Sequence, residues 1–169
     1  DWAFYPHSND SVLEVGIAID DCDADNGPLL VLPGSHRGPV HDHHVDGRFC
    51  GAIDPVAAGL DCSGAVGLVA PAGSIALHHV RMIHGSGVNR SLKPRRLFLI
   101  GYAAADAWPL TENADFDRFR AAMVAGRDTL APRLEPVPVR LPYPRAAHQG
   151  STYENQRELK HPYFPKVKA

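Results

Sequence analysis

The most informative stretch of the chain runs Met82-Ile83-His84-Gly85-Ser86-Gly87-Val88-Asn89-Arg90-Ser91, and Arg95 follows it closely. The spacing of His84 and Arg95 suits one strand, a tight turn and a return strand. At about 3.3 Å of rise per residue, such a hairpin brings both side chains back to the same end of a sheet. A neutral imidazole is a good metal ligand, and a guanidinium is a forked clamp for a carboxylate. The stretch therefore predicts a metal that holds an acidic cosubstrate, although a loop histidine and a surface arginine fit the spacing too.

The rest of the chain indicates many strands, because short apolar segments alternate with clusters of Gly, Pro, Asn and Asp. We expect strands over Val12–Ile19, Leu29–Leu32, Gly67–Ala70, Ile75–His79 and Leu97–Ala103. Strands at such intervals indicate an all-β-dominated sandwich or barrel. In the fourth strand His78 and His79 should face opposite sides, one towards the core and one at the rim. One helix is expected over Ala114–Ala125, with an apolar stripe that packs on the sheet.

Two segments lack regular periodicity. Residues 34–64 form a long, polar segment of the kind that serves as a lid over a binding site. From residue 132 onward proline is too frequent for regular structure, so residues 132–169 are expected to form a tail on the domain or a partner subunit. Residues 1–131 would then be the C-terminal part of the β domain. Its N-terminal part is expected upstream, because the sequence opens without Met in a polar-aromatic run.

Bulk properties exclude several classes of protein. The net charge is −2 and the basic residues are scattered, which gives no electrostatic case for nucleic acid. No apolar run is long enough to span a bilayer. The three cysteines, Cys22, Cys50 and Cys62, have neither disulfide-like nor metal-like spacing, so a reducing, cytoplasmic location is expected. A homo-oligomer is compatible with the sequence.

Two sets of residues could complete a metal site around His84. Two imidazoles and one carboxylate on one octahedral face leave positions open for a cosubstrate and dioxygen, as in non-haem iron oxygenases. His44-Val45-Asp46 is a literal His-x-Asp within the chain. Alternatively, Asp1 is the carboxylate, and its partner His lies two residues upstream, outside the sequence. Spacing alone does not choose between them, although the polar surroundings of His44 favour a solvated loop.

The chain resembles the phytanoyl-CoA dioxygenase family of iron(II)- and 2-oxoglutarate-dependent oxygenases between residue 1 and about residue 103. The resemblance is carried by Asp1-Trp2-Ala3-Phe4-Tyr5-Pro6, Asp25-Asn26-Gly27-Pro28-Leu29-Leu30-Val31-Leu32-Pro33-Gly34-Ser35-His36, Gly73-Ser74-Ile75 and His84-Gly85-Ser86-Gly87-Val88-Asn89-Arg90-Ser91 with Arg95. The Asn-Gly-Pro-Leu to Pro-Gly-Ser-His passage and the His-Gly-Ser-Gly-x-Asn passage are together quite specific. The resemblance implies a double-stranded β-helix, the cupin-like jelly roll, with a few peripheral helices.

The resemblance also implies roles for individual residues. Asp1 would be the carboxylate of the family's His-x-Asp motif and His84 its distal histidine, while the proximal histidine would lie upstream of the sequence. Arg95 would pair with the far carboxylate of 2-oxoglutarate, assisted by the hydroxyl of Ser86. The implied reaction uses O2 to hydroxylate an aliphatic carbon of a small metabolite, with release of succinate and CO2.

Two rival hypotheses remain open. One is a cupin-like jelly roll that binds a small molecule without catalysis. The other is a zinc hydrolase in which His44, Asp46 and His84 hold the metal and a water takes the open position. Hydrolysis needs no carboxylate clamp, so Arg95 would have no role in it.

Overall fold

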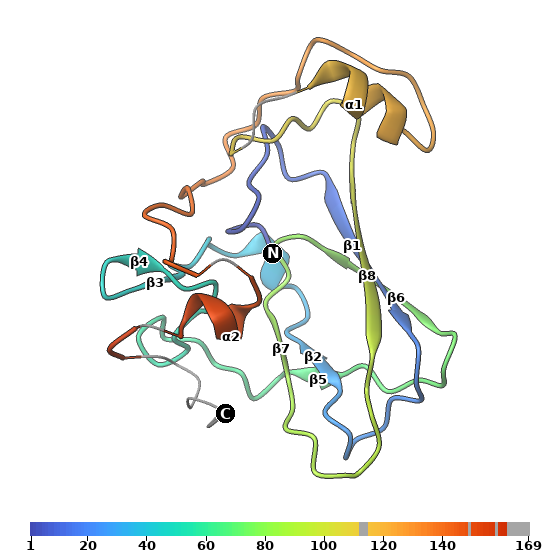
Figure 1. Cartoon of the computed structure of the whole chain (residues 1–169), viewed down its shortest axis with the longest axis vertical. Helices are drawn as coiled ribbons and strands as arrows, with labels where there is room; N and C mark the ends of the chain where they lie inside the picture. Colours follow the sequence, from blue (N-terminus) through green and yellow to red (C-terminus); the bar gives the residue numbers. More distant parts are fainter. Residues whose placement is uncertain (112–114, 149, 158, 162–169) are drawn as a thin grey trace.

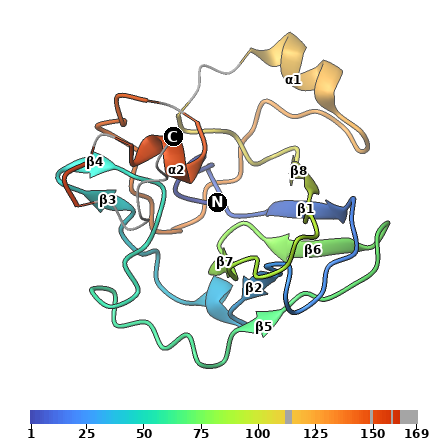
Figure 2. The ribbon, with the colours of Figure 1, turned by 60° about the horizontal axis from the view of Figure 1, so that its bottom comes forward.

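Two antiparallel three-stranded sheets form the centre of the computed structural model, which describes residues 1–111, 115–148, 150–157 and 159–161 (Figure 1). The first sheet has the order β6-β1-β8 and is built from Ile75–His79, Val12–Ala18 and Leu97–Ala103. The second has the order β5-β2-β7 and is built from Val66–Gly67, Leu29–Val31 and His84–Ser86. The two sheets lie next to each other (Figure 2). The predicted strands are confirmed, except that β5 ends at Gly67 rather than continuing to Ala70.

The register of the first sheet decides what faces the second sheet. Glu14 of β1 lies opposite His78 of β6 and opposite Gly101 of β8, so these three residues share one face. The ring of His78 contacts the ring of His84 in β7, with centroids 5.3 Å apart. The face that carries Glu14 and His78 is therefore directed towards the second sheet. His78 is buried and His79 is partly exposed, as predicted.

The remaining elements lie outside the two sheets. Residues 34–64, predicted as a lid without regular structure, contain a 3-10 helix (Ser35–Arg37) and a hairpin of β3 (His44–Val45) and β4 (Arg48–Phe49). The short helix α2 (Thr152–Asn155) lies in the proline-rich segment. In Figure 1 both the hairpin and α2 lie on the side of the molecule away from β1 and β6.

The predicted helix forms, but its packing was predicted wrongly. Helix α1 spans Phe116–Ala122, and the predicted start at Ala114 lies outside the described residues. None of its residues is buried. Its apolar stripe stacks on Trp108, whose ring centroid is 4.7 Å from that of Phe119, because the chain after β8 supplies an aromatic partner before the helix reaches the sheet.

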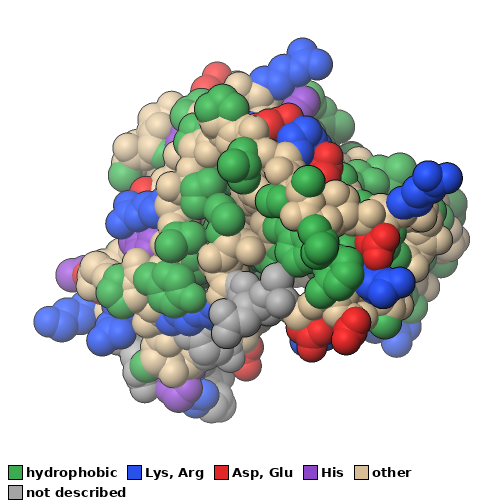
Figure 3. Space-filling model, turned by 90° about the horizontal axis from the view of Figure 1, so that it is seen from above, with side chains coloured by type: hydrophobic (Ala, Val, Ile, Leu, Met, Phe, Trp, Pro, Cys, Tyr) green, Lys and Arg blue, Asp and Glu red, His purple; other side chains and the backbone are tan. Residues whose placement is uncertain are grey.

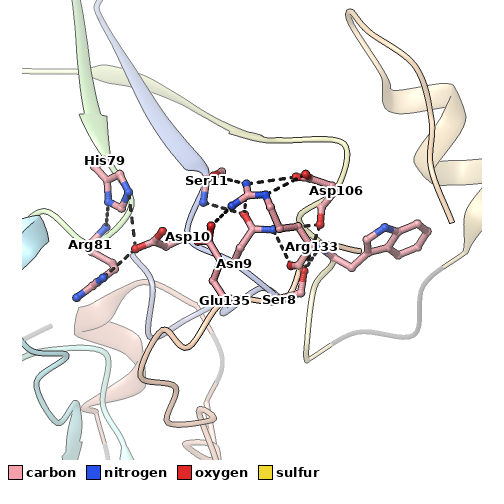
Figure 4. Close-up of polar contacts among 10 residues, drawn as sticks. Ser8, Asn9, Asp10, Ser11, His79, Arg81, Asp106, Arg133 and Glu135 are labelled. Carbon is pink, nitrogen blue, oxygen red and sulfur yellow. Dashed lines mark hydrogen bonds and ion pairs between the residues drawn. The ribbon is translucent and has the colours of Figure 1, made fainter. Parts of the chain in front are cut away.

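The start of the chain and the proline-rich segment pack against the same core. Trp2, Val12, Val80 and Ala107 form its buried centre, and Nε1 of Trp2 donates a hydrogen bond to the carbonyl of Pro138 at 3.0 Å. A second attachment is polar (Figure 4). Asn9 is fully buried, and its amide nitrogen donates to the carbonyls of Asp106 (3.1 Å) and Arg133 (3.0 Å). These bonds connect the segment before β1 to the segment after β8.

The surface mixes residue types. On the face shown in Figure 3, Lys and Arg side chains are scattered among hydrophobic and acidic ones rather than gathered in one patch. Among the described residues, no helix has the length and apolar character needed to cross a bilayer.

Candidate metal centre

The fold brings one carboxylate and two imidazoles together. Asp1 opens the chain, His78 is in β6, and His84 begins β7. One ligand atom of each residue lies within 4.8 Å of the others. Oδ2 of Asp1 is 3.5 Å from Nε2 of His78 and 3.8 Å from Nε2 of His84. The three side chains therefore converge on one point between the two sheets.

The hydrogen bonding of His84 prepares it for a metal. Nδ1 of His84 lies 2.9 Å from the carbonyl oxygen of Met82, which can only accept, so Nδ1 carries the proton. The lone pair is then on Nε2, the atom that faces Asp1. Burial lowers the pKa of His84, so the ring is neutral near pH 7. This is the tautomer and charge state that metal-binding histidines adopt.

His78 fits a metal for a different reason. Its side chain is 7% exposed, and neither ring nitrogen has a hydrogen-bond partner among the described residues. A buried polar group without a partner is costly. Burial also lowers the pKa of His78, which keeps the ring neutral. A divalent cation between His78, Asp1 and His84 would satisfy the orphaned nitrogen, and two imidazoles with one carboxylate are the donor set of non-haem iron sites. The residues present therefore fit such an ion.

The turn between β6 and β7 is fixed by Arg81, and it positions His84. Nη1 of Arg81 donates to Oδ2 of Asp10 at 2.8 Å, and Nη2 donates to the carbonyl of Gly38 at 2.5 Å. The backbone nitrogen of Arg81 also donates to Nδ1 of His79 at 3.2 Å (Figure 4). These contacts attach the turn to the start of β1 and to the segment after the 3-10 helix.

A hydroxyl on the same strand as His84 is bonded to a cationic group. Ser86 is two residues further along β7, so its side chain points to the same face of the strand. Nη2 of Arg95 donates to Oγ of Ser86 at 2.9 Å. The predicted hairpin does not form, because β7 pairs with β2 while β8 pairs with β1 in the other sheet. The turn between the two strands nevertheless places a guanidinium and a hydroxyl side by side, next to the strand that carries the imidazole.

A cavity of about 550 Å³ opens beside the metal centre. Asp1, His84 and Ser86 lie on its wall. Most of the wall is apolar. It comes from the start of the chain, from β2 and the residue after it, from the lid segment and from the turn before β7: Phe4, Leu30, Leu32, Ile53, Leu60 and Met82. Helix α2 closes one side through Thr152 and Tyr153. The cavity is large enough for a small organic molecule.

The alternative metal set of His44, Asp46 and His84 is not brought together. His44 bonds to Oδ1 of Asp42 through Nδ1 (2.7 Å) and to the carbonyl of Tyr143 through Nε2 (3.1 Å). Asp46 accepts hydrogen bonds from the backbone nitrogens of Lys160 and His161. Among the described residues, the group of possible metal ligands contains neither of them. The two residues instead attach the β3-β4 hairpin to the proline-rich segment.

One residue of the centre was missed by sequence reasoning. His78 was expected to be a core or rim histidine, since an isolated imidazole in a strand is no metal motif. Its position in β6 gives it an inward direction, and the short spacing from His84 could have suggested that both reach one point. The roles of Asp1, His84, Ser86 and Arg95 stay predictions, although the structure places Asp1 with His84 and Ser86 with Arg95.

Comparisons with known proteins show the family to which the chain is similar. The family model described as "Phytanoyl-CoA dioxygenase (PhyH)" matches residues 1–97. The chain is 45% identical over 168 residues to a probable alpha-ketoglutarate-dependent hypophosphite dioxygenase of Stutzerimonas stutzeri, a match that covers 97% of this chain and 59% of the relative. It is 32% identical over 123 residues to L-proline trans-4-hydroxylase of Streptomyces griseoviridis, covering 60% of this chain and 46% of that enzyme.

Solved structures agree with the predicted jelly roll. The non-heme alpha ketoglutarate dependent carbocyclase SnoK superposes with a TM-score of 0.52 at 23% identity, covering 76% of this chain and 51% of SnoK. At this identity the likeness concerns the fold alone, and it confirms the predicted class. The chain spans about 59% of the length of the S. stutzeri relative.

Proposed function

The chain belongs to the phytanoyl-CoA dioxygenase family of iron(II)- and 2-oxoglutarate-dependent oxygenases, and we propose that it forms the catalytic centre of such a dioxygenase. The proposed reaction hydroxylates an aliphatic carbon of a small metabolite. It consumes O2 and 2-oxoglutarate and releases succinate and CO2. The observation that carries the proposal is the convergence of Asp1, His78 and His84 beside the Arg95–Ser86 pair.

Each residue of the centre has a proposed task. Asp1 and His84 hold the metal together with a proximal histidine upstream of Asp1, as the resemblance implies, and His78 is a further imidazole that this chain brings next to them. Iron(II), when bound, supplies the oxidising chemistry towards O2 and the keto acid. The protein contributes orientation, because the donors come from β6, β7 and the segment before β1. These elements are fixed to one another by sheet pairing and by the bonds of Arg81.

The Arg95–Ser86 pair is the proposed anchor for 2-oxoglutarate. A guanidinium binds a carboxylate through a planar fork, and a neighbouring hydroxyl adds a third donor. Ser86 points to the same face of β7 as His84, so an acid bound here extends towards the metal centre. Holding the cosubstrate at its far end leaves its keto acid end for the metal.

The cavity supports an organic substrate. Its wall is mainly apolar, as in sites that bind the carbon skeleton of a small molecule. An apolar wall also keeps bulk water away from the reacting centre. A substrate lodged against Leu30, Leu32 and Met82 would lie beside Asp1 and His84, because all these residues line the same cavity.

The S. stutzeri relative supports a second candidate substrate. A protein described as a hypophosphite dioxygenase is 45% identical across nearly the whole chain. Oxidation of hypophosphite converts a P–H bond into a P–OH bond with the same cosubstrates. The cavity also carries hydrogen-bonding groups, since His41, His43 and Arg81 lie on its wall together with His84. A small anion would use these groups and leave the apolar wall unfilled.

Succinate release tests the function and separates the two substrates. The chain is loaded anaerobically with iron(II) and 2-oxoglutarate, exposed to O2, and assayed with hypophosphite and with a panel of small aliphatic metabolites. The proposal expects iron-dependent succinate release, increased at least about tenfold by a metabolite of the panel. Stimulation by hypophosphite alone would select the second candidate. No consumption of 2-oxoglutarate under any condition would favour a non-catalytic binding protein.

A further inference from the structure

One side of the cavity is formed by a part of the chain that has no role in the proposed reaction. Thr152 and Tyr153 lie on the cavity wall, and both belong to α2. The family model ends at residue 97, so α2 lies outside the sequence pattern that defines the family. A wall of this kind can differ between relatives while the metal centre stays the same. We call the described residues from 140 to 161 the C-terminal wall.

Hydrogen bonds attach the C-terminal wall to the β3-β4 hairpin of the lid segment. At the end of β4, the backbone nitrogen of Phe49 donates to the carbonyl of Pro144 at 2.9 Å. At the turn of the hairpin, Asp46 accepts from the backbone nitrogen of His161 at 3.1 Å and lies 2.8 Å from Nδ1 of the same residue. Figures 1 and 2 both show α2 beside this hairpin. The wall and the lid segment therefore form one connected unit.

Helix α2 is packed closely against other residues of the cavity. Gly51 and Phe4 both line the cavity. A Cβ atom at Gly51 would collide with the ring of Phe4 and would lie 3.4 Å from Nδ2 of Asn155 in α2. Asn155 and the next residue, Gln156, are buried. The helix is thus fixed in place, with little space between it and the rest of the cavity wall.

Tyr153 lies at the mouth of the cavity. Its residue is 62% exposed although it forms part of the cavity wall, so the ring lies where the cavity opens to solvent. Ile53 and Leu60 of the lid segment line the same cavity. An aromatic ring at the opening of a cavity of about 550 Å³ limits the length of a molecule that can be enclosed there.

We propose that the C-terminal wall sets the size of the substrate that the cavity accepts, and that Tyr153 is its specificity-determining residue. The substrate is then a compact molecule whose apolar part ends before the mouth of the cavity. A longer molecule would have to displace the ring of Tyr153 or leave apolar surface in water. The inference rests on the proposed function, because it takes the cavity as the substrate site.

Binding of linear 1-alkanols, from butanol to decanol, tests the size limit without relying on turnover. The full chain is titrated with each alcohol by calorimetry. The affinity should rise about fourfold with each added methylene group as long as the alcohol fits, because each buried methylene group contributes a similar free energy. It should stop rising at one chain length. In Tyr153→Ala this limit should move to an alcohol at least about two carbons longer, and in Tyr153→Trp to a shorter one.

Tyr143→Ala is the matched control. It removes an exposed tyrosine ring from the same C-terminal wall, but Tyr143 does not line the cavity. Its length limit should equal that of the wild type. Because Tyr153 is mostly exposed, its substitutions should leave the unfolding midpoint nearly unchanged. If Tyr153→Ala folds poorly, the shorter limit expected for Tyr153→Trp still tests the inference.

Several results would overturn the inference. One is a length limit that is the same in the wild type and both Tyr153 variants. Another is a limit that moves equally in Tyr153→Ala and in Tyr143→Ala. An affinity that keeps rising up to decanol in the wild type, or a wild type that binds none of the alcohols, would show that the cavity imposes no such limit.

Succinate release distinguishes the inference from the function on which it rests. A wild type that releases succinate, with a length limit that Tyr153→Ala leaves unmoved, removes the inference alone. A limit that moves as expected in the Tyr153 variants, without any consumption of 2-oxoglutarate by the wild type, upholds the role of the wall and removes the proposed oxygenase activity.

Discussion

The guanidinium of Arg95 donates a hydrogen bond to Ser86, with Nη2 2.9 Å from Oγ, across the turn that connects β7 of the second sheet to β8 of the first. This contact places a permanent positive charge beside the strand that begins with His84. Replacing Arg95 by Ala should raise the KM for 2-oxoglutarate at least about tenfold, since a charge-assisted hydrogen bond contributes roughly 1.5–3 kcal/mol. Metal affinity should be unchanged. Steady-state kinetics against 2-oxoglutarate and Ni(II) titration measure the two effects.

Arg96 supplies the matched control for Arg95. It is the neighbouring residue, and Nη2 of Arg96 pairs with Oδ1 of Asp20 at 2.7 Å, at the end of β1. Arg96→Ala removes the same charge from nearly the same place but should leave the KM for 2-oxoglutarate within about twofold. An equal rise in the KM for 2-oxoglutarate in both variants would mean that the overall positive charge of this region attracts the cosubstrate, rather than a specific anchor at Arg95.

Ser86→Ala should have a smaller effect in the same direction. The hydroxyl contributes one neutral hydrogen bond, worth about 1 kcal/mol, so the KM for 2-oxoglutarate should rise about fivefold. Because Arg95 also loses its partner, part of this rise reflects a less well-placed guanidinium. A double-mutant cycle with Arg95→Ala measures the coupling. Fully independent effects would contradict a shared binding site.

The sequence predicts the strands well because their apolar segments are bounded by strong turn residues. Pro71 and Gly73 form the turn before β6 begins at Ile75, and the segment between Asn89 and Pro94 separates β7 from β8. The β3-β4 hairpin was not predicted, since its strands are only two residues long. Its stability comes from long-range bonds, such as that of Asp46 with the backbone of His161, which periodicity cannot reveal.

The site was predictable only in part, for a related reason. His84 and Arg95 lie close in sequence, so one turn relates them, although β7 and β8 belong to different sheets and form no hairpin. His78 and Glu14 become neighbours only through the pairing of β1 with β6, and no local pattern marks that pairing. The packing of the apolar stripe of α1 was predicted wrongly for a similar reason. Its aromatic partner, Trp108, precedes the helix and lies outside the periodic pattern of the helix.

Asn9 should be important for stability. Its fully buried side chain donates to the carbonyls of Asp106 and Arg133 and accepts from the backbone nitrogen of Ser11 at 3.1 Å. Asn9→Ala leaves these groups buried without partners and should lower the free energy of unfolding by about 2–4 kcal/mol. Urea unfolding measures the change. Asn89→Ala, at an exposed turn, should cost about 1 kcal/mol or less, and equal losses would contradict the argument from burial.

Stability should fall as the pH is lowered below 6.5, partly because of His43. Burial lowers the pKa of His43 to about 4 from its usual value of 6.5, so the unfolded chain binds a proton in this window before the folded chain does. The free energy of unfolding therefore rises with pH between about 4 and 6.5. His43 should account for a loss on the order of 2 kcal/mol at pH 4, less than the full shift implies, because the side chain keeps some solvent contact.

His43→Asn isolates this contribution. The variant removes the titrating group, so the difference in unfolding free energy between pH 7 and pH 4.5 should be smaller than in wild type. Urea denaturation at the two pH values measures it. Identical pH dependence in the two proteins would show that other groups, among them His78 and His84, account for the whole effect.

The central claim is that Asp1 and His84 share one metal ion, and anaerobic titration with iron(II) tests it most directly. Wild type should bind one equivalent per chain, and His84→Ala should lose most of this affinity. His44→Ala removes an imidazole that bonds Asp42 and should bind iron(II) like wild type. Unchanged binding by His84→Ala together with loss of binding by His44→Ala would contradict the account and place the metal in the β3-β4 hairpin.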